Sequence, residues 1–102
     1  MVPKHLKIRG HTYKVSQVSS RTLEGAQADV DSESNRIRLY RRLTASRKIE
    51  CLLHEVLHAL LDGYTLEEDV EEDVVVTLGE GLTSFIQDNP AFIRHALAVL
   101  CK

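Results

Sequence analysis

The sequence predicts an α+β domain in which a small antiparallel or mixed β-sheet precedes three helices. Over roughly the first forty residues, apolar and polar side chains alternate in short runs, which is the period of half-buried strands. From Thr44 onward, apolar residues recur every three or four positions, which is the period of amphipathic helices. Breaks at Gly63 and at Asn89-Pro90 divide this second part into three helices.

The first part of the chain should contain four strands. Residues 6–9 and 13–18 both alternate, and Gly10-His11 between them suits a hairpin turn. A weaker strand is expected over residues 26–30, and the turn-forming segment 31–35 leads from it into the strand Ile37–Tyr40. Since charged side chains blunt an exposed sheet edge, the flanking Arg36 and Arg38 place this last strand at the edge.

The three helices are marked by capping residues as well as by their period. Thr44 or Ser46 can cap the first, which Gly63 ends, and Thr65-Leu66-Glu67-Glu68 has the form of a capping box for the second. Asn89 and Pro90 suit the cap and first position of the third. The apolar positions of the second helix, expected to face the first, are Val70, Val74, Val75, Leu78, Leu82, Phe85 and Ile86.

Composition restricts the classes of protein that need to be considered. The 102 residues carry a net charge of −2, with 43% apolar and 27% charged residues, as in ordinary globular domains. The N-terminus has no apolar segment of a secretory signal, and no apolar run approaches the roughly 20 residues of a membrane span. We therefore predict a single domain over residues 1–102 in the cytoplasm, without a membrane partner.

Two further residue groups bear on partners and redox state. Cys51 and Cys101 both lie in apolar helical surroundings, so two buried free thiols are expected, with one disulfide as the alternative. A basic cluster consists of Arg36, Arg38, Arg41, Arg42, Arg47 and Lys48. It lacks interleaved aromatic residues on which bases could stack, so we do not expect nucleic acid as a partner.

The main chemical signal is His54-Glu55-Val56-Leu57-His58 within the first predicted helix. Residues four apart lie on the same face of a helix, so two imidazoles can point at one zinc ion. Glu55 is offset by about 100° from His54, which suits a general base acting on a zinc-bound water better than it suits a ligand. The pattern therefore predicts zinc bound by His54 and His58, with Glu55 as the catalytic residue.

A third protein ligand is expected from the acidic second helix. If that helix packs antiparallel on the first, residues near 68–73 return to the level of His58. Glu71 continues the line of apolar residues that faces the first helix, which makes it the favoured ligand. Glu72 is the second candidate, and Glu80 lies two turns further on, nearer the level of Cys51.

At these residues the chain resembles the small zincin metallopeptidases, and in particular compact phage and prophage relatives of the ImmA/IrrE-type peptidases. The similar segments are residues 53–60, 71–75 and 81–90, together with the strand Ile37–Tyr40 ahead of the motif helix. The resemblance implies a minimal zincin-like fold, zinc ligation by His54, His58 and a glutamate of the next helix, and Glu55 as general base. One departure is that Val74 and Val75 stand where many such enzymes carry a small residue and an Asp or Asn that orients a histidine.

Two functions are compatible with this sequence. The first is a zinc peptidase that hydrolyses a protein or peptide, with a phage regulator in the host cytoplasm as a target suggested by family analogy. The resemblance implies that the substrate adds to the edge strand, which we expect to be Ile37–Tyr40. The alternative is a non-catalytic zincin-fold module that binds a protein and whose metal is structural or lost.

Overall fold

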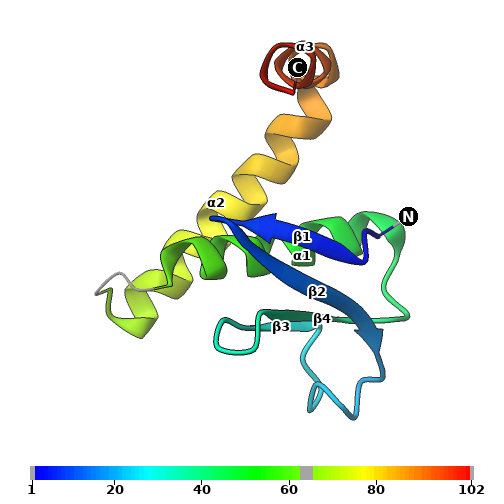
Figure 1. Ribbon diagram of the computed structural model, residues 1–102, viewed down its shortest axis with the longest axis vertical. Helices are drawn as coiled ribbons and strands as arrows, with labels where there is room; N and C mark the ends of the chain where they lie inside the picture. The colour runs from blue at the N-terminus through cyan, green and yellow to red at the C-terminus, as the bar shows by residue number, and fades with distance from the viewer. Residues whose placement is uncertain (1, 63–65, 102) are drawn as a thin grey trace.

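The computed structural model describes residues 2–62 and 66–101 and confirms the α+β architecture, with a four-stranded mixed sheet followed by three helices (Figure 1). The elements are β1 (His5–Ile8), β2 (His11–Val18), β3 (Ala28–Asp31), β4 (Arg36–Tyr40), α1 (Ala45–Leu61), α2 (Glu68–Asp88) and α3 (Pro90–Leu100). Within the described residues, no helix combines the length and the apolarity that crossing a membrane requires.

The strand order is β1-β2-β4-β3, with β2 and β4 parallel and the outer pairs antiparallel. The prediction that Ile37–Tyr40 forms an edge strand is therefore wrong, because β4 lies between β2 and β3. Arg38 is tolerated inside the sheet because Asp29, directly opposite on β3, accepts hydrogen bonds from its guanidinium group. The edge on this side of the sheet is β3.

Both predicted turns form, the first one residue earlier than the predicted Gly10-His11, because His11 already belongs to β2. Arg9 and Gly10 have φ angles of 51° and 86° between β1 and β2, a left-handed pair that suits a two-residue hairpin. Between β3 and β4, the Asp31 side chain accepts hydrogen bonds from the backbone N–H groups of Glu33 and Ser34. This second turn holds β3 beside β4 and so fixes the edge strand next to the helical layer.

Helix α1 covers one face of the sheet and forms the core with it. Thr44 is its N-cap, as predicted, and its hydroxyl accepts a hydrogen bond from the backbone N–H of Arg47. The buried cluster between α1 and the sheet contains Ile8, Tyr13, Val15, Ile37, Leu39, Cys51 and Ala59. Because α1 packs closely on β3 and β4, its polar side is held in a fixed position over the β3 edge.

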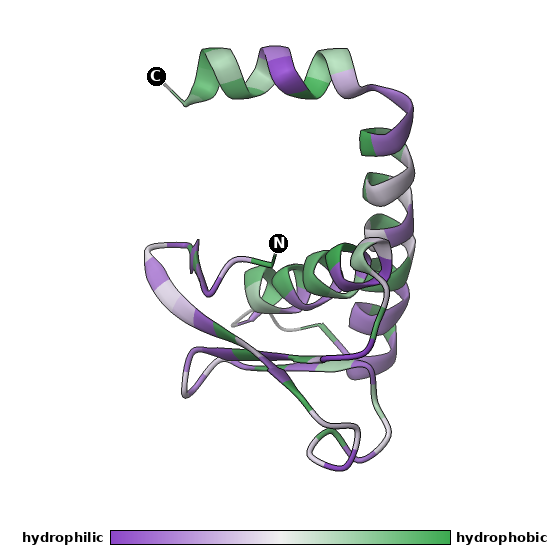
Figure 2. Cartoon of the chain, turned by 90° about the vertical axis from the view of Figure 1, so that its right-hand side faces the viewer, coloured by the Kyte–Doolittle hydropathy of each residue, from purple (hydrophilic) through white to green (hydrophobic). Residues whose placement is uncertain are grey.

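Helix α2 packs on α1 through its N-terminal part, as far as Gly79. Val75 and Gly79 are buried in the contact, whereas Leu78, Leu82 and Phe85 are exposed, so most of its predicted apolar side does not face α1. The second half extends away from the sheet and ends at α3, which has no buried residue (Figures 1 and 2). The apolar helical period therefore predicted that these segments are helices, but it did not predict which of their apolar side chains are buried by other elements.

Several predicted helix ends and the cysteine environments can be compared with the structure. Gly63 and Thr65 lie outside the described residues, and α2 begins after Glu67, later than a capping box from Thr65 would start it. Asn89 is the N-cap residue of α3 and Pro90 begins the helix, as predicted, although the Asn89 side chain donates to the Phe85 carbonyl and makes no capping hydrogen bond to α3. Both cysteines are free, as predicted, yet only Cys51 is buried and Cys101 is exposed.

Candidate metal centre

Helix α1 presents His54, Glu55 and His58 on the side that faces β3 and α2. The two imidazole rings have centroids 5.0 Å apart, as expected for positions four apart on a helix. Cys51 and Ala59, one turn before and one turn after Glu55 on the same helix, are buried against the sheet and anchor the helix there. The motif therefore lies on a rigid element, which is what a preorganised site requires.

Helix α2 returns antiparallel and brings a carboxylate to both rings. Oε1 of Glu72 lies 3.3 Å from Nε2 of His54, and its Oε2 lies 3.0 Å from Nε2 of His58. One ligand atom from each of these three residues lies within 4.8 Å of the others, a grouping that could hold a metal ion. The two Nε2 atoms thus converge on one carboxylate, although Glu72 itself is half-exposed.

Glu71 lies beside this group and contacts the other nitrogen of His58. Its Oε2 is 2.8 Å from Nδ1 of His58, and the pair is largely shielded from solvent. A carboxylate at Nδ1 favours the tautomer that carries its proton there, which leaves Nε2 free to bind a metal. The sequence predicted that Glu71 and Glu72 return to the level of His58, and both contact its ring. Of the two, Glu72 belongs to the group whose ligand atoms converge, whereas Glu71 contacts the other nitrogen of His58.

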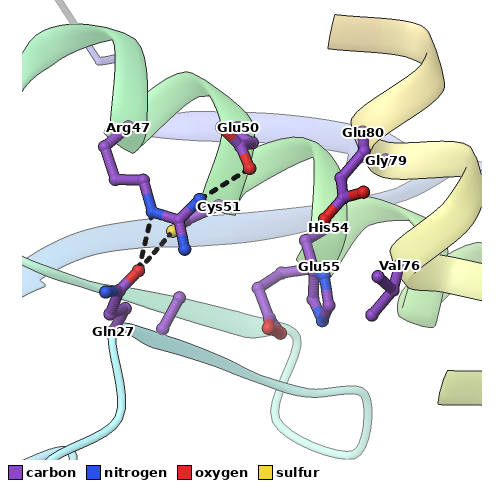
Figure 3. A pocket seen from close by; sticks show the side chains of 10 residues that line it. Gln27, Arg47, Glu50, Cys51, His54, Glu55, Val76, Gly79 and Glu80 are labelled. Carbon is purple, nitrogen blue, oxygen red and sulfur yellow. Dashed lines mark hydrogen bonds and ion pairs between the residues drawn. The ribbon is translucent and has the colours of Figure 1, made fainter.

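The third carboxylate considered from the sequence, Glu80, belongs to an adjoining pocket of about 280 Å³. It lines this pocket together with Cys51 and His54, and it does not belong to the group of converging ligand atoms (Figure 3). Gly79 of α2 is buried at this level, and a Cβ there would come 3.9 Å from Cα of His54. An alanine would fit at that distance, so close packing accounts for the burial of Gly79 without requiring glycine.

Glu55 is the only buried charged residue in the described part of the chain, with 6% of its surface exposed. Burial raises the pKa of Glu55 from its ordinary 4.5 to about 7. His58 opposes this rise, whereas the negative charges of Asp29 and Glu72 add to it. A carboxyl group with a pKa near 7 can both accept and release a proton at neutral pH, which suits a general base.

This burial predicts a pH-dependent stability of the metal-free protein. Because the folded-state pKa of Glu55 exceeds the unfolded one, its stabilising contribution is full below 4.5 and is lost as pH rises through about 7. The raised pKa corresponds to about 3 kcal/mol, as an upper value. Urea unfolding with chelator present at about pH 5 and about pH 8 should show this loss in the wild type relative to Glu55→Gln. Equal pH dependence in both proteins would contradict it.

A second hollow, of about 670 Å³, has all three residues of the metal group in its lining and is open to solvent. The two hollows share Ala28, His54 and Glu55, and together they follow residues 27–33 along β3. The larger one is lined by eight carboxylates and by no lysine or arginine; these are Asp29, Asp31, Glu33, Glu55, Asp62, Glu68, Glu71 and Glu72. We call it the acidic basin.

The acidic basin includes a residue that the sequence did not single out. Asp29 lines it and pairs with Arg38, and its charge contributes to the raised pKa of Glu55. Its position was difficult to foresee, because it depends on β3 pairing with β4 so that Asp29 and Arg38 face each other. The only sequence signal was an acidic residue in a weak strand opposite a basic one.

The donor set could hold a metal ion. Two imidazole nitrogens and one carboxylate oxygen, with the acidic basin open beside them, correspond in number and type to the three protein ligands and accessible fourth position of a zinc site that binds water or substrate.

Comparison with known proteins does not extend this conclusion. No family model matches the chain, and no curated protein or solved structure was found to be similar to it. The geometry alone therefore carries the functional inference.

Proposed function

We propose that this protein is a zinc-dependent peptidase of the zincin type, with His54, His58 and Glu72 as ligands and Glu55 as general base. The observation that carries the proposal is the convergence of the two Nε2 atoms on Glu72 beside a buried carboxyl group. Nitrogen and carboxylate donors in this combination suit zinc. When bound, zinc supplies an electropositive centre that acidifies water and polarises a carbonyl group.

The side chains of the chain itself have separate roles in this proposal. Glu55 takes the proton from the attacking water and passes it to the leaving amine, a role open to a buried carboxyl group held beside the ligands. Glu71 holds the His58 ring through Nδ1, 2.8 Å away. It would thus fill the orienting role for which Val74 and Val75 offer no polar group.

The edge strand β3 is the proposed binding site for an extended substrate. Its outer side is unpaired within the described sheet, and the two hollows run along it past His54 and Glu55. An extended peptide could add to such an edge through main-chain hydrogen bonds and place side chains alternately into pockets. The proposed substrate strand is therefore Ala28–Asp31, in place of the interior strand Ile37–Tyr40.

Metal content and hydrolysis together test this function. The wild type should bind one zinc ion per chain, measured by elemental analysis after dialysis, and should cleave unfolded casein. A zinc chelator should stop cleavage and re-added zinc should restore it, whereas His54→Ala should lose both zinc and cleavage. A wild type that binds no zinc would refute the metal site. Zinc binding without cleavage of casein or of the peptide set described next would favour the non-catalytic alternative.

The acidic basin predicts a preference for cationic peptides. Although Asp29 pairs with Arg38, eight carboxylates in a lining without lysine or arginine create a negative potential that concentrates positively charged chains, even after one zinc ion is bound. Peptides of one sequence frame carrying lysines should be cleaved with a kcat/KM about tenfold above that of glutamate-bearing counterparts at low salt, a difference of the size that electrostatic steering produces.

Variants of the rim provide the control for this preference. Glu33→Gln combined with Glu68→Gln removes two exposed charges of the acidic basin and should reduce the preference. Glu24→Gln, exposed and outside both hollows, should leave it unchanged. Since surface charges are screened by salt, the preference should also shrink at high ionic strength. A preference for acidic peptides would contradict the prediction.

A further inference from the structure

The arm formed by α3 and the outer half of α2, residues 77–88, contains none of the proposed zinc ligands and not the general base, although its Gly79 and Glu80 also line the smaller hollow. We propose that this arm is the interface of a two-fold homodimer, in which α3 of one copy packs on the outer half of α2 of the other. The proposal does not depend on the peptidase function.

Helix α3 packs against no described helix or strand of its own chain other than α2. None of its residues is buried. The corner between the two helices is fixed by an edge-on contact of Phe85 with Phe92 and by the Asn89 side chain, which donates to the Phe85 carbonyl. Figures 1 and 2 show α3 carried away from the sheet and α1 by the length of this outer half. The corner therefore keeps α3 from folding back on its own core.

The arm exposes an apolar surface of the size that a dimer needs. Its large exposed apolar side chains, each 40–81% exposed, are Leu78, Leu82, Phe85, Ile86, Phe92, Leu97, Val99 and Leu100. With roughly 200 Å² for a large side chain, they present on the order of 800 Å². A standard interface buries about 800 Å² per partner, whereas a monomer rarely exposes apolar patches beyond a few hundred Å².

The charges of the arm make it complementary to itself. The outer half of α2 carries Glu80 and Asp88 and no basic residue, whereas α3 carries Arg94 and His95 and no acidic one. In a two-fold dimer each α3 meets the α2 of the other copy, so both contacts join a basic helix to an acidic one. Opposite charges at the rim then fix the orientation of an otherwise apolar contact. A second copy is thus an occupant that satisfies both the apolar area and the charges.

The first test is the mass of the full chain in solution. Light scattering coupled to size exclusion should give twice the 11.5 kDa of the chain, falling towards 11.5 kDa on dilution. Leu97→Glu should weaken dimerisation by at least about tenfold. Ile49→Glu is the matched control, because Ile49 is 57% exposed, like Leu97, but lies on α1 and outside the arm. It should leave the dimer intact. Circular dichroism establishes that both variants are folded.

The second test examines the pairing itself. Arg94→Glu should weaken the dimer, and adding Asp88→Arg should recover part of the loss, because the two helices then exchange their charges. In a mixture of isotope-labelled and unlabelled copies, intermolecular NOEs should join α3 side chains to those of α2 residues 78–86. A folded wild type that remains monomeric at every concentration would overturn the proposal. So would a dimer whose NOEs lie outside the arm, or one that Ile49→Glu and Leu97→Glu affect equally.

Discussion

Glu55→Gln is expected to lower kcat for peptide hydrolysis by about 10²- to 10⁴-fold, the contribution of a positioned general base. Glutamine keeps the size and the polar character of the side chain but cannot accept a proton from water at neutral pH. Since Glu55 is buried beside the ligands and is not one of the three that converge, the zinc content should remain near that of the wild type. The measurement is kcat on a cleavable peptide, with zinc determined on the same sample.

Two controls accompany the kcat measurement on Glu55→Gln: a matched substitution of an exposed glutamate, and the pH dependence of stability. Glu24→Gln changes an exposed glutamate outside both hollows and should leave kcat unaffected. Glu55→Gln should also lose the pH dependence of stability that the buried carboxyl group causes, which shows that this dependence comes from Glu55. If Glu55→Gln binds zinc and hydrolyses peptides at the wild-type rate, Glu55 is not the base.

The helical part of the fold could be predicted because its signals are local. The spacing of Ile49, Leu52, Val56 and Leu60 and the capping by Thr44 act within a few residues, and α1 formed where they placed it. The same spacing put His54 and His58 on one face. What lies against an apolar face depends on distant segments, so the exposure of Phe85 and the surface position of α3 could not be read from the period.

The strand order was beyond such local reasoning. Arg36 and Arg38 resembled the charges of an exposed edge, but a charge is also tolerated in an inner strand when the neighbouring strand supplies its partner. Asp29 does this for Arg38 across the β3–β4 pair. The pairing of β4 with β2, in parallel, joins segments about twenty residues apart, and no turn sequence specifies such a contact.

The third ligand illustrates the same limit within the site. The helical period placed Glu71 towards α1 and Glu72 about 100° away, and it could not say which nitrogen of His58 either carboxylate would reach. That choice depends on how far α2 is rotated and shifted against α1, which is set by the burial of Val75 and Gly79. In the structure, both carboxylates contact His58, from opposite sides of its ring.

Substitution of the two glutamates should separate these roles by zinc affinity. Glu72→Ala removes a proposed ligand and is expected to weaken zinc binding by more than about 100-fold, whereas Glu71→Ala removes an orienting partner and should cost about 10- to 100-fold. Glu71→Gln should recover most of this loss, because its amide oxygen can still accept the Nδ1–H of His58. Glu72→Gln should not recover to the same extent, because a neutral amide is a weaker zinc ligand than a carboxylate. Competition with a chromophoric chelator measures all four constants.

The spectrum of the cobalt-substituted protein distinguishes a lost ligand from a misplaced one. Loss of Glu72 should change the coordination and hence the absorption bands of cobalt, whereas loss of Glu71 should lower affinity with the bands largely retained. If instead Glu71→Ala abolishes binding and Glu72→Ala does not, Glu71 is the ligand, as its position in the helical period predicted. The contacts favour the first result, because the oxygens of Glu72 lie 3.3 and 3.0 Å from the two Nε2 atoms, and Glu71 reaches His58 through Nδ1.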